Sequence, residues 1–213
     1  MKAGNAFGAT WNALVAALFA CVLGVMLGAV VPAAHAASQP PETMVKAIVD
    51  DVLGVIRENR DRAALRNLAE KKVLPHFDFR EMTRLAVGTA WRKASPEQQG
   101  ALEKNFRTLL VNTYTNALAS GASAATTVEY KPGVTKDNDA TVRTVVKQSG
   151  KQPIPIDYRL AQRDGEWKVY DVVVEGVSLV TNYRSSFSEE VSKSGIDGLI
   201  HNLEQRNNSL AKG

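Results

Sequence analysis

The sequence predicts an α+β domain in which helices pack on one face of a curved four-stranded antiparallel sheet. Apolar residues recur at helical spacing in residues 44–121, alternate with polar residues in 126–174, and return to helical spacing in 177–205. The helices therefore precede and follow a block of strands instead of alternating with them. Because short turns join the strands, we expect an antiparallel meander covered by helices.

The first 36 residues are expected to be a cleaved signal peptide. An apolar run covers residues 13–31, and Ala34 and Ala36 then form the small-residue pattern at which signal peptidases cut. A retained membrane anchor is the alternative, because the run is just long enough to span a bilayer. Cleavage would leave residues 37–213 as one domain and would remove Cys21, the only cysteine in the sequence.

The composition argues against several functional classes. Lys and Arg number 26 against 22 Asp and Glu, and the two signs are interspersed without a basic and aromatic recognition motif. No nucleic-acid partner is therefore expected. One cysteine and three histidines without metal-ligand spacing argue against a disulfide scaffold and a zinc site. Because no phosphate-binding glycine loop is present either, we expect no cofactor.

The helices before the sheet have recognisable starts. Asp61 is a suitable N-cap for the second helix, and Ser95-Pro96 followed by Gln98 forms a capping box for the fourth. The helices expected before the sheet cover residues 44–58, 61–73, 77–88 and 95–121.

Tight turns divide the middle of the chain into strands. Turn residues occupy 136–139 and 149–151, and Asp164-Gly165 is a two-residue hairpin signal. The four expected strands cover residues 126–134, 140–146, 154–160 and 167–174. Two further helices, 177–191 and 196–205, are expected to complete the chain.

Asp171 and Glu175 are the carboxylates with the strongest claim to chemistry. A carboxylate inside a cone-shaped sheet could act as a general base on a steroid-like substrate. The favoured interpretation is structural: Asp171 bonds to backbone or to Arg184, and Glu175 caps the helix that follows Gly176. No second acid or base is positioned with them, so we do not expect an enzyme.

Residues 164–187, DGEWKVYDVVVEGVSLVTNYRSSF, closely resemble the signature stretch of the MlaC family. Residues 77–84 (FDFREMTR) and 88–92 (GTAWR) fit the same family, as does the helix that carries Phe106, Leu109, Leu110 and Tyr114. The family comprises periplasmic phospholipid-binding proteins of the pathway that maintains outer-membrane lipid asymmetry. They are also known as toluene-tolerance auxiliary proteins.

The resemblance implies an NTF2-like fold whose helices and sheet enclose a deep apolar pocket. It implies a two-tailed phospholipid as ligand, with its tails inside and its head group facing solvent. It also implies a shuttle between an outer-membrane lipoprotein–porin complex and an inner-membrane ABC transporter with MCE-domain subunits. The alternatives are a carrier associated with hopanoids, a periplasmic enzyme that uses Asp171 or Glu175 as its base, and an interaction module that binds no lipid and uses the sheet face.

The inward-facing apolar and aromatic positions are the candidates for lining such a pocket. The pattern alone does not distinguish a packed core from a hollow one, since both require the same stripes. The expected lining residues are Met82, Leu85, Trp91, Phe106, Leu109, Leu110, Tyr114, Val142, Val146, Ile156, Tyr158, Trp167, Val169, Val173, Val177, Leu179, Val180, Tyr183 and Phe187.

Overall fold

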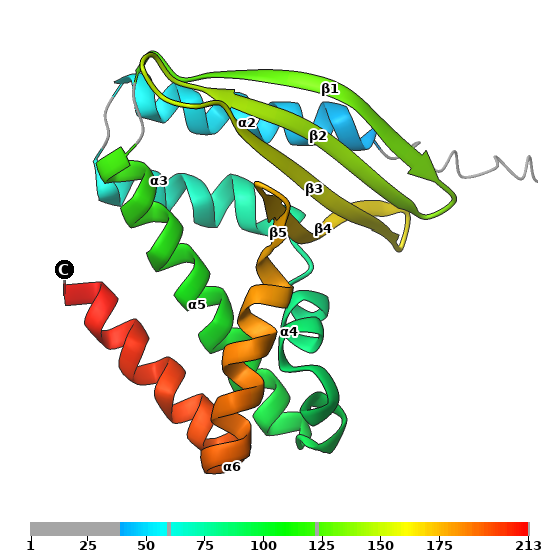
Figure 1. Cartoon of the computed structure of the whole chain (residues 1–213), viewed down its shortest axis with the longest axis vertical. Helices are drawn as coiled ribbons and strands as arrows, with labels where there is room; N and C mark the ends of the chain where they lie inside the picture. The colour runs from blue at the N-terminus through cyan, green and yellow to red at the C-terminus, as the bar shows by residue number, and fades with distance from the viewer. Residues whose placement is uncertain (1–38, 59–60, 122–123, 213) are drawn as a thin grey trace, which may run out of the picture. The chain divides into compact units, whose positions relative to one another are not determined.

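A curved antiparallel sheet forms one layer of the fold, and its strands follow one another in chain order (Figure 1). The computed structural model describes residues 39–58, 61–121 and 124–212, so the predicted signal peptide lies outside the described residues. The strands are β1 Thr127–Lys136, β2 Asp139–Lys147, β3 Ile154–Arg163, β4 Glu166–Val174 and β5 Val177–Ser178. The predicted α+β class is confirmed, and the expected four-stranded sheet is corrected to five strands.

The additional strand lies where the sequence predicted the start of a helix. After β4 the chain turns through Glu175 and Gly176, whose φ angles are 51° and 81°. The short strand β5 then pairs antiparallel with the end of β4. The last helix therefore begins at Leu179 and not at Val177.

The helical segments are α2 Pro41–Glu58, α3 Arg62–Leu68, the π turn η1 Ala69–Val73, the 3-10 turn η2 Leu74–His76, α4 Phe79–Val87, the 3-10 segment η3 Gly88–Lys93, α5 Pro96–Gly121 and α6 Leu179–Lys212. The helix predicted over residues 61–73 is thus α-helical only as far as Leu68. In the described parts of the chain, no helix combines the length and hydropathy that a bilayer-spanning segment needs.

The predicted helix starts are confirmed by their hydrogen bonds. The Asp61 carboxylate accepts from the Ala64 N–H at 2.9 Å. At the start of α5, Ser95 Oγ accepts from the Gln98 N–H at 3.2 Å, and Gln98 Oε1 accepts from the Ser95 N–H at 3.0 Å. This reciprocal pair satisfies two N–H groups that a helix terminus otherwise leaves without partners.

Helix α2 packs along the sheet and forms a first apolar core with it (Figure 1). The buried residues of this core are Met44, Val45, Ala140, Val142, Leu160, Trp167 and Val169. Both contributions from α2 come from its first turns. Later in the helix, Ile48 and Val49 pack partly against this core, and Ile56 packs with Leu65 of α3 in a third, smaller cluster.

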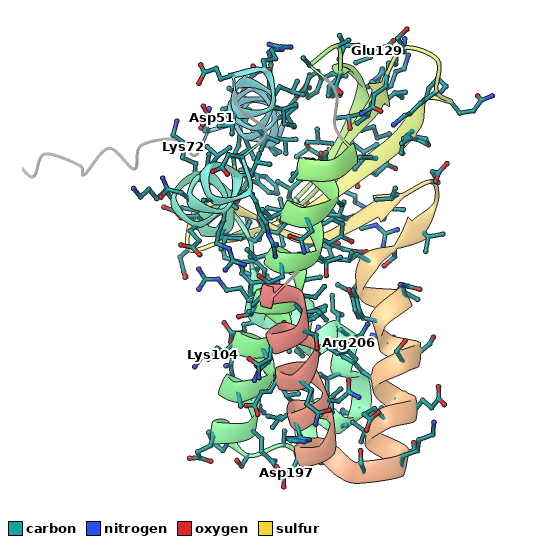
Figure 2. All side chains as sticks on the ribbon, turned by 90° about the vertical axis from the view of Figure 1, so that its left-hand side faces the viewer. Asp51, Lys72, Lys104, Glu129, Asp197 and Arg206 are labelled. Atoms are coloured by element: carbon teal, nitrogen blue, oxygen red, sulfur yellow. The ribbon has the colours of Figure 1, made fainter. Side chains whose placement is uncertain are left out.

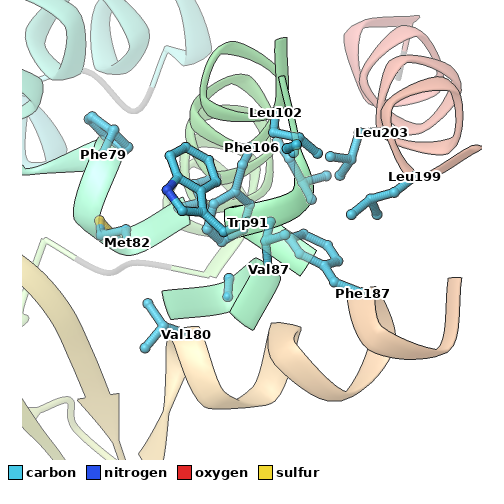
Figure 3. Packing of buried hydrophobic residues seen from close by; sticks show 14 residues of the cluster. Phe79, Met82, Val87, Trp91, Leu102, Phe106, Val180, Phe187, Leu199 and Leu203 are labelled. Atoms are coloured by element: carbon cyan, nitrogen blue, oxygen red, sulfur yellow. The ribbon is translucent and has the colours of Figure 1, made fainter. Parts of the chain in front are cut away.

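A second apolar core joins α4, η3, α5 and the two halves of α6 (Figure 3). Phe106 is fully buried at its centre. Its ring packs edge-to-face against Tyr183, with centroids 4.9 Å apart, and against Phe187, with centroids 5.2 Å apart. Such aromatic pairs add about 0.5–1.5 kcal/mol each beyond the burial of their area.

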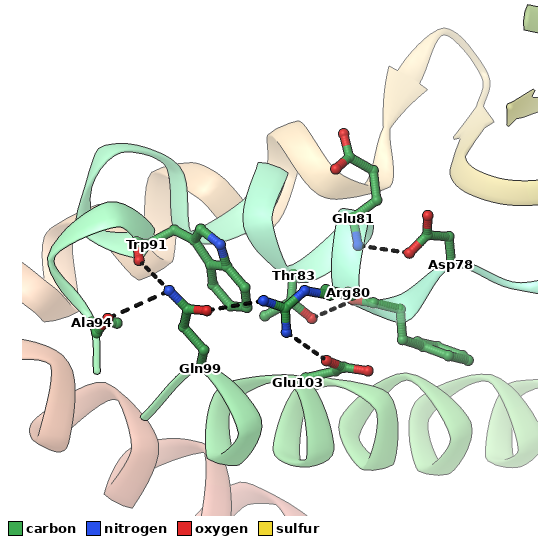
Figure 4. Close-up of polar contacts among 9 residues, drawn as sticks. Asp78, Arg80, Glu81, Thr83, Trp91, Ala94, Gln99 and Glu103 are labelled. Atoms are coloured by element: carbon green, nitrogen blue, oxygen red, sulfur yellow. Dashed lines mark hydrogen bonds and ion pairs between the residues drawn. The ribbon is translucent and has the colours of Figure 1, made fainter. Parts of the chain in front are cut away.

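Gln99 fixes η3 against α5 (Figure 4). Its Nε2 donates to the Trp91 carbonyl at 3.0 Å, and its Oε1 accepts from Arg80 Nη2 at 3.2 Å. The Arg80 guanidinium also lies over the Trp91 ring, 5.5 Å from its centroid. Trp91 is thus held from both its backbone and its ring.

Helix α6 reverses direction at Gly195, so residues 179–194 and 196–212 run as two arms (Figure 1). Gly195 has φ 73° and ψ −173°, a conformation that is essentially restricted to glycine. The reversal brings Leu199 and Leu203 back onto the second core, where both are buried.

We predict opposite effects for two glycine-to-alanine substitutions. Gly195→Ala should lower the free energy of unfolding by about 1–3 kcal/mol, because alanine is strained at this φ and ψ. Gly100→Ala is the matched control: the residue lies within α5 and, apart from its chain neighbours and the backbone of its own helix, no described atom lies within 4 Å of the added Cβ. It should raise stability by about 0.4–1 kcal/mol. Urea unfolding measures both, and equal effects would contradict the role given to Gly195.

Candidate functional site

An apolar cavity with two lobes lies between the sheet and the helices α2, α3 and α5. The larger lobe has a volume of about 440 Å³ and the smaller one about 200 Å³. The side chains that line both lobes are Val52, Val73, Phe77, Tyr114 and Leu118. The lobes therefore meet at these five residues, and neither lobe is sealed from solvent. Among the described residues, no charged side chain lines either lobe.

Helix α2 supplies one wall of the larger lobe. Its apolar residues recur every three or four positions and so form one face of the helix. The members of this face that line the lobe are Val45, Ile48, Val49, Val52, Leu53 and Ile56. Strands β1 to β4 supply the opposite wall through Val128, Val146, Ile154, Ile156, Tyr158 and Val169.

The π turn η1 shapes the smaller lobe. A π turn holds one more residue than an α turn, so it rotates the following side chains relative to a regular helix. Val73 and Leu74 thereby line the lobe. Lys72 points to solvent, where its Nζ lies 3.0 Å from Asp51 on α2 (Figure 2). This exposed pair links two walls of the cavity from outside, although such pairs are worth at most about 1 kcal/mol.

A β-bulge in β4 decides which of its valines face the cavity. Arg159 of β3 pairs with Asp171 and Leu160 pairs with Val169, which leaves Tyr170 as the additional residue. Because a bulge shifts the alternation by one position, Val172 and Val174 line the smaller lobe after it. Val173 is buried on the opposite face of the strand.

The expected pocket residues fall into two groups in the structure. Those that line the cavity are Met82, Leu110, Tyr114, Val146, Ile156, Tyr158, Val169 and Leu179. Those that do not line it are Leu85, Trp91, Phe106, Leu109, Val142, Trp167, Val173, Val177, Val180, Tyr183 and Phe187. Most of the second group pack in one of the two cores. Val177 instead lies in β5 with 59% of its surface exposed.

Several sets of lining residues were not predicted from the sequence, among them those of α2, η1 and β4. The stripe on α2 is visible in the sequence, but nothing in it indicates that its later turns face a cavity instead of the sheet. Val172 and Val174 carry a clearer signal, because three consecutive valines break the alternation expected of a strand with one buried face. Phe77 was also missed, although it lines both lobes and forms a bridge with Val169.

Tyr114 is the most polar side chain where the two lobes meet. Burial, with a smaller effect from Tyr183, raises the pKa of Tyr114 to about 12. The hydroxyl therefore stays uncharged at neutral pH and brings a hydrogen-bonding group to the cavity without a charge. The residue as a whole is 42% exposed, so it is not sealed inside the protein.

Asp171 lies on the face of β4 opposite to the cavity lining and has only 1% of its surface exposed. Its carboxylate accepts from Ser178 Oγ at 2.7 Å, the Val180 N–H at 3.2 Å and Arg159 Nη1 at 3.2 Å. These bonds tie β4 to the start of α6. A buried carboxylate with three donors is a structural connection and is not placed to act on a molecule in the cavity.

Two expected contacts of this region are corrected. Asp171 bonds to backbone, as expected, through the Val180 N–H, whereas Arg184, the alternative partner, donates from Nε to the Leu85 carbonyl at 2.8 Å. Glu175, proposed as a helix cap, lies in the turn before β5. Ser178 takes the capping role, because its Oγ accepts from the Thr181 N–H at 3.2 Å. The physical reason is the two-residue strand, which separates Glu175 from the first turn of α6.

The fold and the cavity together define an α+β protein with an uncharged, apolar interior space open to solvent. In the described residues, no cluster of His, Cys, Asp or Glu could hold a metal ion. The sequence profile described as MlaC protein matches residues 46–205. The chain belongs to the MlaC family.

Individual relatives extend this comparison. The intermembrane phospholipid transport system binding protein MlaC of Haemophilus influenzae is 25% identical over 177 residues, covering 79% of this chain and 83% of the relative. The toluene tolerance protein ttg2D of Pseudomonas putida is 27% identical over 179 residues, covering 81% and 82%. A phospholipid-binding protein from Ralstonia solanacearum, solved in complex with a phospholipid, is 36% identical with a TM-score of 0.74. That match covers 81% of this chain and 99% of the solved one.

The hydrogen bonds of Asp171 generate a stability prediction. Asp171→Asn keeps the shape but removes the charge and turns one acceptor into a donor that faces other donors. We expect a loss of about 1–3 kcal/mol in urea unfolding. Asp157→Asn on the neighbouring strand β3 is the control, because its side chain is 37% exposed and lies 4.0 Å from Arg143. That change should cost less than about 1 kcal/mol. Equal effects would show that the Asp171 contacts do not stabilise the fold.

Proposed function

We propose that this protein binds a two-tailed phospholipid in the cavity and carries it across the periplasm, between the inner and the outer membrane. The observation that carries the proposal is the uncharged two-lobed cavity. It is supported by the Ralstonia solanacearum relative, which was solved with a phospholipid bound. In this proposal the acyl tails occupy the lobes and the head group faces solvent.

The energetics of acyl tails favour an enclosed cavity over a surface groove. At about 0.8 kcal/mol per buried methylene, a tail of roughly 16 carbons is worth about 12 kcal/mol. Leaving a third of it in water costs roughly 4 kcal/mol relative to the bilayer. A carrier must therefore offer an interior nearly as dry as the membrane, and an apolar lining with no charged group supplies it.

The same lining argues against catalysis in the cavity. General acid–base chemistry needs a titratable group within reach of the substrate. The described lining supplies only tyrosines as titratable groups, and burial raises the pKa values of Tyr114 and Tyr158. Asp171 is engaged elsewhere, so the alternative of an enzyme with Asp171 or Glu175 as base has no supporting observation. We propose a carrier that performs no reaction.

The remaining parts of the proposal concern location and partners. Residues 1–36 act as the export signal, and residues 37–213 form the lipid-binding domain in the periplasm. The partners are an outer-membrane lipoprotein–porin complex and an inner-membrane ABC transporter with MCE-domain subunits. The name of the Haemophilus influenzae relative, which places that protein in an intermembrane phospholipid transport system, supports this assignment.

Two substitutions in the cavity should remove the lipid. Val172→Asp adds a carboxylate to the smaller lobe, whose described lining offers no cation to offset its desolvation. Val52→Trp fills the junction of the lobes. In each variant, purified from the periplasm, we expect at least about tenfold less phospholipid per protein. Mass spectrometry of an organic extract provides the measurement.

The matched controls are Val134→Asp and Val134→Trp, because Val134 is 54% exposed on β1, outside the cavity. Both should retain the wild-type lipid content. Circular dichroism and urea unfolding identify variants that fail to fold. Folded cavity variants with the wild-type lipid content would contradict the assignment of the cavity. A wild-type protein that carries no lipid and takes none up from vesicles would overturn the carrier function itself.

A further inference from the structure

A second concave surface lies over α4, η3 and the first arm of α6. This groove has a volume of about 410 Å³, and none of its lining residues lines the cavity. Its charged residues are Arg84, Arg92 and Arg184, joined by the hydroxyls of Thr89 and Ser188. Among the described residues, no carboxylate lines it.

The three arginines differ in how far they are already neutralised. Arg84 is paired with Glu81, with its Nη2 2.6 Å from Oε1, and its side chain is still 50% exposed. Arg184 donates only from Nε, to the Leu85 carbonyl at 2.8 Å, so its two Nη groups have no partner among the described residues. The Arg92 guanidinium makes no hydrogen bond or ion pair with any described residue. The groove therefore carries cations that are not compensated within the described chain.

The floor and one wall of the groove are held in place by neighbouring residues. Gly88 has φ 65° and ψ −131°, and a Cβ at this position would lie 3.7 Å from Arg184 Nε. A side chain there would be strained and would reduce the space beside the guanidinium. Trp91 forms the adjoining wall and is fixed by Gln99 and Arg80 (Figure 4). The bond from Arg184 Nε to the Leu85 carbonyl orients the guanidinium, which reduces the side-chain freedom that is lost when a ligand binds.

We propose that this groove is a docking site for an acidic segment of a partner protein. Guanidinium groups bind carboxylates through paired, charge-assisted hydrogen bonds, and hydroxyls beside them can donate to the same oxygens. The cations line a recess, which suits an extended chain with acidic side chains better than the flat plane of a membrane surface. The site binds whether or not the cavity holds lipid, so the proposal goes beyond lipid carriage and does not rest on it.

The groove and the cavity share one structural element. Phe79 and Met82 of α4 line the smaller lobe, whereas Arg84 and Val87 of the same helix line the groove. A partner held at the groove therefore contacts the helix whose other face forms part of the lipid site. Helix α4 thus separates the groove from the cavity, and a partner bound in the groove does not cover the cavity lining.

The test uses the purified protein and a fluorescein-labelled peptide of alternating Glu and Gly, with the Gln–Gly peptide as its uncharged counterpart. Fluorescence anisotropy measures binding at low and high salt. We expect the Glu peptide alone to bind, and high salt to weaken the binding. Arg92→Gln should weaken it at least about threefold, and R84Q/R92Q at least about tenfold. Both variants keep Arg184 and its bond to Leu85.

Arg143→Gln is the matched control, because Arg143 lies on β2 and its side chain is 49% exposed, close to the value for Arg84. It should change the affinity less than about twofold. An equal loss in R143Q would mean that net charge alone attracts the peptide, and undiminished binding in R84Q/R92Q would equally overturn the proposal.

A second experiment replaces the peptide with vesicles of phosphatidylglycerol in phosphatidylcholine. If they bind through Arg84 and Arg92 while the peptide does not, the groove is a membrane site and the proposal is wrong.

The lipid content of R84Q/R92Q separates this proposal from the proposed function. It should equal that of the wild type, because none of the described groove residues lines the cavity. A folded variant that loses its lipid would contradict the independence of the two sites. A wild-type protein without lipid that still binds the Glu peptide would overturn lipid carriage and leave the docking site supported.

Discussion

The buried carboxylate of Asp171 connects the two parts of this protein. The sheet packs on the first turns of α2, and the helices α4, α5 and α6 pack on one another, so each part has its own apolar core. The bonds from Ser178 and Val180 to Asp171 tie β4 to α6. On the cavity side, the Asp78 N–H donates to the Val169 carbonyl at 2.9 Å and ties β4 to α4. The sheet and the helices are thus held together along β4. They do not need to pack against each other across the cavity beside this strand.

Because of this arrangement, strand β4 contributes to an apolar core, lines the cavity and joins the sheet to the helices. Before the bulge at Tyr170, Trp167 and Val169 pack toward α2. After it, Val172 and Val174 face the cavity and Asp171 faces the opposite side. A regular strand would keep one alternation throughout, and Asp171 would then lie on the same side as Val169. The bulge therefore keeps a carboxylate away from the apolar lining.

Local signals in the sequence predict the elements well, because each depends on neighbouring residues. The capping box of Ser95 and Gln98 and the hairpin at Asp164-Gly165 are examples, and both lie where they were expected. The cavity lining could not be predicted in the same way. It depends on the bulge at Tyr170, on the π turn after Leu68 and on where the two cores stop, which long-range packing decides. An apolar stripe such as that of α2 is the same whether it meets side chains or a bound tail.

The chemistry of the cavity has a consequence for how cargo is released in the proposed carrier. An apolar tail gains little on moving between a dry cavity and a bilayer, because both remove the same surface from water. Affinity for the tails therefore cannot set where the lipid goes. Charge can set where the lipid goes, because charged groups on a surface away from the cavity govern how the carrier meets a partner and how it is oriented against that partner. Arg92 and Arg184 lie on such a surface, and α4 links it to the lining through Met82. Binding of the cargo and choice of the partner are thereby assigned to opposite faces of one helix.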